Sequence, residues 1–282
     1  MLRNNRVFLL RSAVLTDLSS ALSDINAGTK VLDITAGDYL YVGTDLPFNH
    51  RHFEVSVAND QAAAMAVDIW DGENWIPTLD LVDETQGTAG KTLSQSGIIS
   101  FTPNPDTNQW NWDDTDEMTG SGLETLKIFG LYWARFKPSA SLKATTELLY
   151  VGHKFSNDAA MEAEYPDLAR STLKTAWKVG KTNWNEQHLL AAEYVVADLR
   201  SIKNLISSPN QILNWENYEK AGVHRAAAVI FQGLGEDYAR ELGVSMNAYK
   251  AALNVGNHQI DNNRNATLDE GERVQTNVFM TR

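Results

Sequence analysis

AMAVDIWDGENWIP, residues 64–77, is the stretch that decides the fold of the first half of the chain. Its residues up to Trp70 are rich in apolar and β-branched types and predict a strand. Asp71-Gly72 follows, a pair that suits a tight hairpin because glycine adopts positive φ at little cost. Trp75 to Pro77 then predicts the returning strand. The stretch therefore predicts antiparallel β-structure.

The same pattern extends on both sides, from Arg6 to about Gly152. Short segments of β-branched and aromatic residues alternate with Gly, Asp, Asn and Pro, as in an all-β domain. Further strands are expected at residues 30–34, 39–42, 52–57, 97–101, 130–136 and 147–151. Residues 104–122, rich in Asp, Asn, Thr and Trp, predict a long loop. We therefore expect residues 1–156 to form an antiparallel β-sandwich of jelly-roll type.

The composition changes after Asn157, where Ala, Leu, Glu, Lys and Arg dominate and apolar residues recur at helical spacing. Helices are predicted at residues 167–179, from an N-cap at Asn185 to Ser208-Pro209, from 215 to 231 with Gly233 and Gly235 closing it, and at 246–255. Residues 157–282 are thus expected to form a small helical bundle that ends in a strand near the C-terminus. The whole chain is predicted to be an α+β protein of two domains.

Charge and composition exclude several classes of function. The 282 residues contain no cysteine, so disulfides, thiolate metal sites and thiol nucleophiles are excluded. A formal net charge of −12 argues against specific nucleic-acid binding, because contacts to phosphates need a positive face. No window reaches the run of about 20 apolar residues that a membrane span needs. We expect a soluble protein without a membrane partner, made in a cytoplasm.

Enzyme motifs are absent from the sequence. It has no Gly-rich phosphate loop, no nucleophile-elbow serine and no His-Glu-x-x-His zinc motif, so we expect no enzymatic activity. The densest acidic run, at residues 113–117, could line a glycosidase cleft, but a solvated loop is the preferred interpretation. His50 and His52 could share a metal on one strand face, but a simple surface pair is favoured over that site.

Tryptophans offer a candidate binding surface. Trp75, Trp110 and Trp112 lie in or beside predicted loops of the β-domain, where exposed aromatic rings could stack on sugars or contact a partner. Trp70 and Trp133 lie within apolar strands, where core packing explains them equally well. We keep carbohydrate or partner binding by the first three as an alternative.

The segment from Asp261 to Glu272 has the spacing of an EF-hand calcium loop. Counted as twelve residues, it places oxygen-bearing side chains at the ligand positions, namely Asp261, Asn263, Asn265, Asp269 and Glu272. Position 6 departs from the pattern, because Ala266 stands where the turn requires glycine, and the residues after Glu272 predict a strand and not an exiting helix. A loop without an ion is favoured. We expect no cofactor, with Ca²⁺ as the open alternative.

Two parts of the chain resemble virion proteins of tailed phages. Residues 68–77, 93–101 and 131–136 resemble a pattern found in neck, tail and baseplate components. The helices from 167 to 255, the loop 261–272 and the tail 276–282 are similar to the head-tail adaptor, or connector, family. Members of that family have a small helical bundle, an Asp/Asn-rich loop and a terminal strand that ends in arginine.

The resemblance implies a virion structural protein in the phage neck, made in the host cytoplasm. Its copies would form a homo-oligomeric ring, usually a dodecamer, that docks on the portal protein and contacts neck or tail proteins such as a tail terminator or collar fibre. DNA would pass through the lumen. Docking would use the terminal segment, here Val274, Thr276, Val278, Phe279, Met280 and Arg282. The alternative is a tail or baseplate protein whose β-domain binds carbohydrate or a host receptor.

Overall fold

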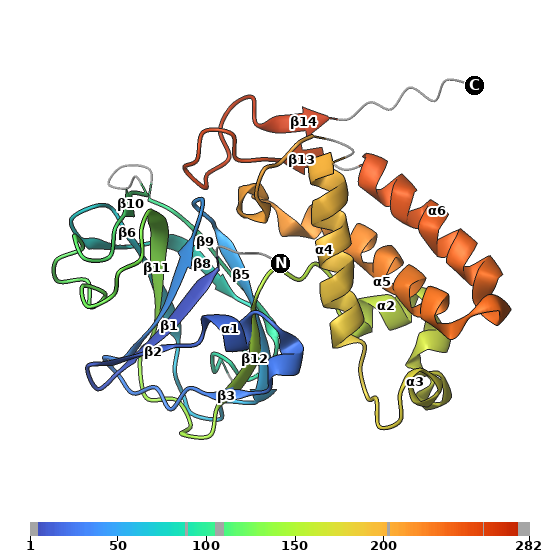
Figure 1. Ribbon diagram of the computed structural model, residues 1–282, viewed down its shortest axis with the longest axis horizontal. Helices are drawn as coiled ribbons and strands as arrows, with labels where there is room; N and C mark the ends of the chain where they lie inside the picture. The colour runs from blue at the N-terminus through green and yellow to red at the C-terminus, as the bar shows by residue number, and fades with distance from the viewer. Residues whose placement is uncertain (1–4, 88–89, 105–109, 202–203, 256, 276–282) are drawn as a thin grey trace. The chain divides into compact units, whose positions relative to one another are not determined.

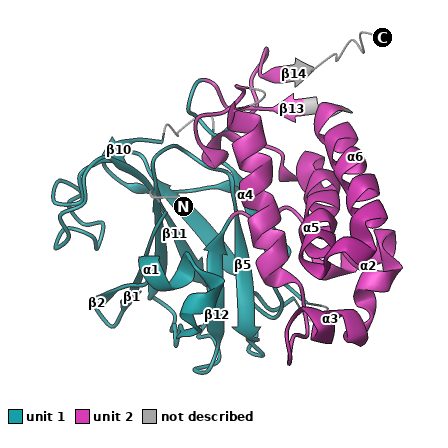
Figure 2. Cartoon of the chain, turned by 45° about the vertical axis from the view of Figure 1, so that its right-hand side comes forward, with its two compact units in different colours: residues 1–152, 263–267 teal, residues 153–262, 268–282 magenta. Residues whose placement is uncertain are grey.

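The structure, a computed structural model, describes residues 5–87, 90–104, 110–201, 204–255 and 257–275 (Figure 1). The chain is α+β and divides into two compact units (Figure 2). The first comprises residues 1–152 together with 263–267, and the second comprises residues 153–262 and 268–282. The division lies four residues before the expected one at 156. The return of residues 263–267 to the first unit has no counterpart in the sequence prediction.

One antiparallel sheet of the first unit has the strand order β2-β1-β4-β11-β6-β7, and β10 pairs with β11. The hairpin predicted at Asp71-Gly72 joins β6 to β7, with Trp70 opposite Trp75 and Gly72 at φ +106°. The strands are β1 (Arg6–Arg11), β2 (Val14–Asp17), β4 (Tyr39–Thr44), β6 (Met65–Trp70), β7 (Trp75–Pro77), β10 (Trp112–Asp113) and β11 (Leu131–Pro138).

The other antiparallel sheet has the order β3-β12-β5-β9-β8. Its strands are β3 (Lys30–Val31), β5 (His50–Val57), β8 (Leu79–Asp83), β9 (Gly97–Thr102) and β12 (Glu147–Gly152). A short helix, α1 (Ser19–Leu22), and a 3₁₀ turn at Ile25–Ala27 follow β2. Each strand expected from the sequence overlaps an observed one, although the strand expected at residues 30–34 is limited to Lys30–Val31. β1, β2, β8 and β10 were not expected as separate strands.

Two apolar clusters stabilise the first unit. The larger cluster draws side chains from both sheets, including Val42 and Phe136 from one and Phe53 and Ile99 from the other. The smaller cluster combines Tyr41, Trp70 and Trp133 of the first sheet with the buried loop residues Met118 and Leu123. Because the loop after β10 contributes to this second cluster, it is a packed part of the unit and not only a solvated connection.

Helices dominate the second unit. They are α2 (Asp158–Glu164), α3 (Ser171–Trp177), α4 (Asn185–Ser201), α5 (Glu219–Leu234) and α6 (Ala239–Val255), with 3₁₀ turns at Pro166–Ala169, Pro209–Gln211, Trp215–Tyr218 and Glu236–Tyr238. α2 was not predicted, and α6 begins seven residues before the expected 246. α5 ends at Gly235, whose φ of +94° agrees with the predicted glycine stop.

α5 packs against both α4 and α6. Val195 and Leu199 of α4, Ala221 of α5, and Tyr249 and Leu253 of α6 belong to one buried cluster. A second cluster gathers side chains of α2, α4 and α5 around the fully buried Trp184. None of the helices within the described ranges has the length and apolar character needed to cross a membrane.

A two-stranded ribbon follows α6. β13 (Asn257–Gln259) pairs antiparallel with β14 (Arg273–Gln275), and the loop predicted as a calcium site connects them. The strand expected at residues 274–280 is therefore present at its beginning, and its remainder, from residue 276, lies outside the described residues.

Candidate functional site

The C-terminal ribbon is hydrogen-bonded to another segment of the chain along its β13 edge. Val274 of β14 pairs with His258 of β13, and beyond β13 the backbone N–H of Leu213 donates to the carbonyl of Gln259. Along the part of the chain that the structure describes, β14 has no ladder partner on its other edge. Of the expected docking residues, only Val274 lies in the described part. Thr276, Val278, Phe279, Met280 and Arg282 lie outside the described residues.

An edge of this kind has a defined chemistry. A strand paired on one side presents a row of backbone N–H and C=O groups that can accept another chain as an added strand. β14 therefore offers main-chain hydrogen bonding to a partner. The ribbon is the first candidate surface for assembly.

The loop 261–272 is held by the carboxylate of Glu272. One of its oxygens, Oε1, accepts from the backbone N–H of Asn262 at 2.7 Å, and Oε2 accepts from that of Asp269 at 3.0 Å. Asn265 Oδ1 accepts from the backbone N–H of Thr267 at 2.8 Å. A calcium loop instead uses this glutamate as a bidentate metal ligand. In this structure Glu272 thus stabilises the loop backbone through its two carboxylate oxygens.

Position 6 of the loop also has a structural role. Ala266 adopts φ +56°, the left-handed region that glycine would occupy, and its side chain is buried in the larger cluster of the first unit. Within the described ranges, no group of three or more His, Asp or Glu residues has an arrangement that could hold a metal ion. Packing of its side chain in the first unit accounts for alanine at position 6 of the loop.

The three candidate tryptophans lie in different environments. Trp110 is buried, with its ring centroid 5.2 Å from that of Phe48. Trp75 is half-buried beside Trp70, and its indole N–H donates to the carbonyl of Ser121 at 3.2 Å. Only Trp112 is largely exposed, at 57%. The three rings therefore do not form one exposed stacking surface, because two of them pack within the unit.

Sequence reasoning missed a second exposed aromatic residue, Phe129. Its side chain is 69% exposed, and it directly precedes Gly130, against which the Trp112 ring packs. A Cβ placed on Gly130 would lie 3.2 Å from the nearest ring atom of Trp112. The only sequence signal was a bulky aromatic residue next to a glycine at the start of a predicted strand. We call Trp112 and Phe129 together the aromatic pair.

The acidic run beside Trp112 is partly structural. Asp113 Oδ2 accepts from the indole N–H of Trp70 at 2.8 Å, and Asp114 Oδ1 accepts from the backbone N–H of Gly130 at 2.7 Å. Asp116 and Glu117 are exposed in the turn that follows. Two of the four carboxylates expected to line a glycosidase cleft thus serve to hold the loop.

His50 and His52 both lie on β5 but have different partners. His50 Nδ1 is 2.8 Å from Asn49 Oδ1, and His52 Nε2 is 2.9 Å from Glu54 Oε2. Burial, assisted by the neighbouring charge of Arg51, lowers the pKa of His50 to about 3, so its ring is neutral at physiological pH. The hydrogen bonds of the two rings therefore point to structural roles.

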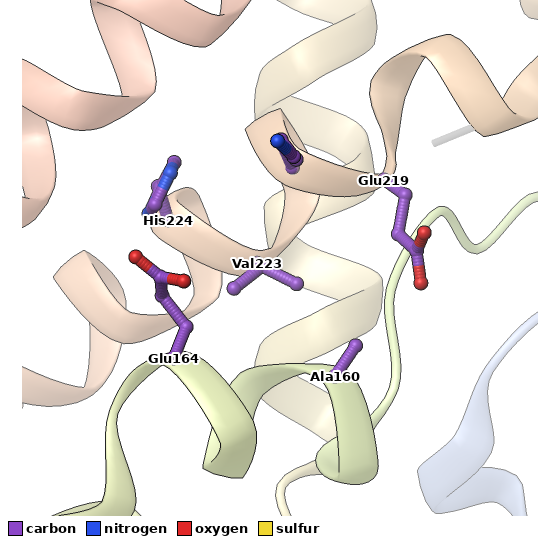
Figure 3. A pocket seen from close by; sticks show the side chains of 6 residues that line it. Ala160, Glu164, Glu219, Val223 and His224 are labelled. Carbon is purple, nitrogen blue, oxygen red and sulfur yellow. The ribbon is translucent and has the colours of Figure 1, made fainter.

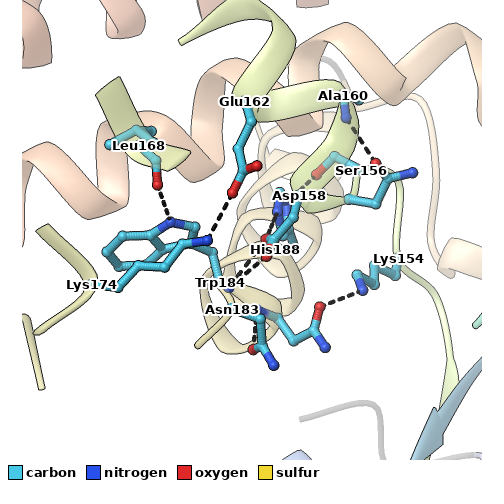
Figure 4. Close-up of polar contacts among 12 residues, drawn as sticks. Lys154, Ser156, Asp158, Ala160, Glu162, Leu168, Lys174, Asn183, Trp184 and His188 are labelled. Atoms are coloured by element: carbon cyan, nitrogen blue, oxygen red, sulfur yellow. Dashed lines mark hydrogen bonds and ion pairs between the residues drawn. The ribbon is translucent and has the colours of Figure 1, made fainter. Parts of the chain in front are cut away.

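Ser156, His188 and Asp158 form a hydrogen-bonded chain in the second unit (Figure 4). Ser156 Oγ is 2.7 Å from His188 Nδ1, and His188 Nε2 is 3.1 Å from Asp158 Oδ1. These are the residue types of a hydrolytic triad. Ser156, however, is buried, and a Cβ on Gly222 of α5 would lie 3.1 Å from its Oγ. The hydroxyl is therefore packed against a helix.

Asp158 also accepts a backbone hydrogen bond just before the start of α4. Both of its carboxylate oxygens lie within 3.2 Å of the backbone N–H of Trp184. Burial alone would raise the pKa of Asp158, but hydrogen bonds from His188 and Trp184, together with Lys174, outweigh it and lower the pKa. The carboxylate is thus held ionised where α2 meets α4. The chain of three residues is best explained as a structural tie between these helices.

A shallow pocket of about 250 Å³ lies between α2 and α5 (Figure 3). The hydroxyl of Tyr165 is 2.7 Å from His224 Nδ1, and burial lowers the pKa of His224. Charges of both signs line the pocket, so it does not favour a ligand of one charge. Its lining residues are Ala160, Glu164, Glu219, Lys220, Val223 and His224.

Comparison with protein-family models, curated proteins and solved structures gives no match. The function is therefore argued from the residues of the chain itself.

Proposed function

We propose that this chain is a structural protein of a tailed-phage virion, a head-tail adaptor whose copies form a ring that docks on the portal and links it to the tail. In this proposal the two sheets of the first unit are packed as a jelly-roll-like β-sandwich that faces other neck proteins. The resemblance of the C-terminal half to the adaptor family motivates the proposal. The observation that supports it is the edge of β14 that has no ladder partner among the described residues.

The edge supplies a mechanism for docking. If β14 continues as a strand beyond Gln275, its backbone can add to the sheet of a neighbouring subunit or of the portal. The alternating side chains from Val274 onward would then supply specificity. Head-to-tail contacts of this type generate a closed ring when the rotation between subunits closes. One type of contact, repeated, would thus build the assembly.

The charge of the chain is compatible with a DNA channel. A formal net charge of −12 makes its surface repel the phosphate backbone of DNA on average. DNA that passes through the lumen of a ring should slide and not adhere to such a surface. The acidic composition therefore supports a conduit role better than a packaging role.

Deletion of residues 275–282 tests the docking mechanism. The truncated chain should retain both units, because every described strand and helix is preserved except the last residue of β14, but it should not be incorporated into particles. A matched control is Val179→Ser, which changes a large apolar side chain that is 88% exposed, and should be incorporated normally. Normal incorporation of the folded truncation would contradict the proposal.

Electron microscopy of particles that contain the tagged chain tests the location. A twelvefold ring at the portal supports the adaptor proposal. Density at the distal tail tip with threefold or sixfold symmetry would overturn it in favour of a baseplate or host-binding role.

A further inference from the structure

The aromatic pair is an unusual feature of the first unit's surface. Trp112 and Phe129 are 57% and 69% exposed, whereas Trp110 and Trp133 of the same unit are buried. Large aromatic side chains left in water are a free-energy liability unless a partner covers them, and Trp is over-represented among residues that dominate binding. The pair is therefore a candidate binding surface for a partner.

The two residues lie next to each other in space although they are 17 positions apart in the sequence. The Trp112 ring packs against Gly130, which directly follows Phe129. One face of the indole is thus supported by the backbone. In β10, Trp112 is also paired with Tyr132 of β11, which fixes its main chain.

The segment that bears Phe129 is fixed as well. The backbone N–H of Thr115 donates to the carbonyl of Ile128 at 2.9 Å, and Thr115 Oγ1 accepts from the backbone N–H of Ile128 at 3.1 Å. On the other side of Phe129, the backbone N–H of Gly130 donates to Asp114 at 2.7 Å. An aromatic surface that is already ordered loses little conformational entropy when a partner binds.

Acidic residues outnumber basic ones in the segment that joins the two residues of the pair. Between Trp112 and Gly130 the only basic residue is Lys127, against five acidic ones, namely Asp113, Asp114, Asp116, Glu117 and Glu124. The face of an aromatic ring attracts cations, and neighbouring carboxylates add to that attraction. A guanidinium or ammonium group is therefore the complementary chemistry.

The chain uses the same combination inside the first unit. The guanidinium carbon of Arg135 lies 4.8 Å from the ring centroid of Tyr39 and 4.9 Å from that of Trp75. Its Nε donates to Asp68 Oδ2 at 2.8 Å. This internal arginine, held by two aromatic rings and a carboxylate, shows the arrangement that a partner's basic side chain would adopt at the aromatic pair.

We propose that Trp112 and Phe129, with the carboxylates of the 113–117 run, form a docking surface for a basic segment of a partner protein that presents arginine or lysine beside an apolar side chain. The proposal does not depend on the adaptor function or on β14. A neutral glycan is less well matched, because its hydroxyls can donate hydrogen bonds to the carboxylates but bring no positive charge to balance them.

A synthetic peptide tests the surface in the full-length protein. The probe is an acetylated, amidated hexapeptide of alternating leucine and arginine, and the controls are the leucine–glutamate and leucine–glutamine versions and a neutral hexasaccharide. Binding is followed by the indole N–H signal of Trp112 in ¹H–¹⁵N spectra, assigned by its loss in Trp112→Ala. The arginine peptide should bind saturably below about 1 mM and shift this signal.

Variants locate the contact. Trp112→Ala and Phe129→Ala should each weaken binding on the order of 10-fold, whereas Val82→Ser, at a site of similar exposure (56%) in the same unit, should leave it unchanged. Asp116→Asn combined with Glu117→Gln should weaken binding and reduce its salt dependence. Circular dichroism of each variant separates loss of contact from loss of folding.

Three results would overturn the proposal. One is the absence of saturable binding by the arginine peptide. Another is equal binding of the glutamine or glutamate version. The third is binding of the hexasaccharide in preference to the arginine peptide with loss in Trp112→Ala, which would assign the surface to a glycan. None of these results depends on whether the 275–282 deletion enters particles, so the two proposals fail separately.

Discussion

Trp133 of β11 lies with its six-membered ring against Gly43 of β4, its direct cross-strand partner. A Cβ placed on Gly43 would lie 2.7 Å from two ring atoms and 2.8 Å from a third. Since real Cβ atoms do not approach this closely, glycine at position 43 is required by the ring and not by backbone conformation. The pair anchors the cluster that holds the loop after β10.

Gly43→Ala should lower the free energy of unfolding of the first unit by about 1–3 kcal/mol, because the added methyl group must displace a fully buried indole. Chemical denaturation followed by tryptophan fluorescence measures the change. Gly243→Ala is the matched control: the position is inside α6 with nothing within 4 Å of the added Cβ, so the same substitution should stabilise by about 0.5–1 kcal/mol. Equal effects at both sites would contradict the packing explanation.

Asp158→Asn should destabilise the second unit by about 1–2 kcal/mol at pH 7, because the charged acceptor at the start of α4 is lost. The pKa of Asp158 is lowered on folding, so its contribution is present above the unfolded pKa of about 3.9 and lost as the pH falls through the folded pKa. Urea denaturation between pH 7 and pH 3, followed by helical circular dichroism, should show the difference between wild type and variant shrinking towards acid. A difference in stability between wild type and variant that stays constant from pH 7 to pH 3 would contradict this prediction.

His50→Gln should make the protein less sensitive to mild acid. The pKa of His50 falls from about 6.5 in the unfolded chain to about 3 in the fold. The folded state therefore favours the neutral ring, and the stability that this provides is complete above pH 6.5 and decreases as the pH falls towards 3. Glutamine cannot take up the proton, so melting temperatures measured across this window should decline less for the variant. Parallel declines would rule out His50 as the titrating group.

Glu272→Ala should destabilise the loop between β13 and β14, because two backbone N–H groups lose their acceptors, at a cost of about 1–3 kcal/mol. Hydrogen exchange at Asn262 and Asp269 reports the loss directly. Glu272→Gln keeps one acceptor oxygen and should have an intermediate effect. Addition of calcium should leave the melting temperature of the wild type unchanged, and a calcium-dependent increase would show that the carboxylate binds the ion instead.

Local sequence patterns predicted the strands and helices better than they predicted the environment of the candidate binding residues. The hairpin at Asp71-Gly72 and the glycine stop at Gly235 follow from short-range rules, and both are present. Trp110 and Trp112, two residues apart in one polar segment, have opposite exposures because Trp110 contacts Phe48, which is far away in sequence. Burial of this kind depends on the tertiary fold, and no local pattern contains it.

The loop 261–272 illustrates the same limit. Oxygen-bearing residues at alternate positions suit both an ion and a series of tight turns, and the spacing cannot distinguish them. The structure adds that Glu272 accepts two backbone hydrogen bonds and that Ala266 is buried in the core of the first unit. Predicting either fact from the sequence would require knowing where the loop lies in the fold.

The return of residues 263–267 to the first unit has a consequence for biosynthesis. Ala266 is part of the first unit's core, but it is translated after all of the helices of the second unit. The first unit can begin to fold on the ribosome, yet its core reaches its full complement only after α6 of the second unit has been synthesised. A premature stop before residue 263 would therefore leave the first unit, as well as the second, without part of its interior. Such a product would be recognisable to cellular quality control as incomplete.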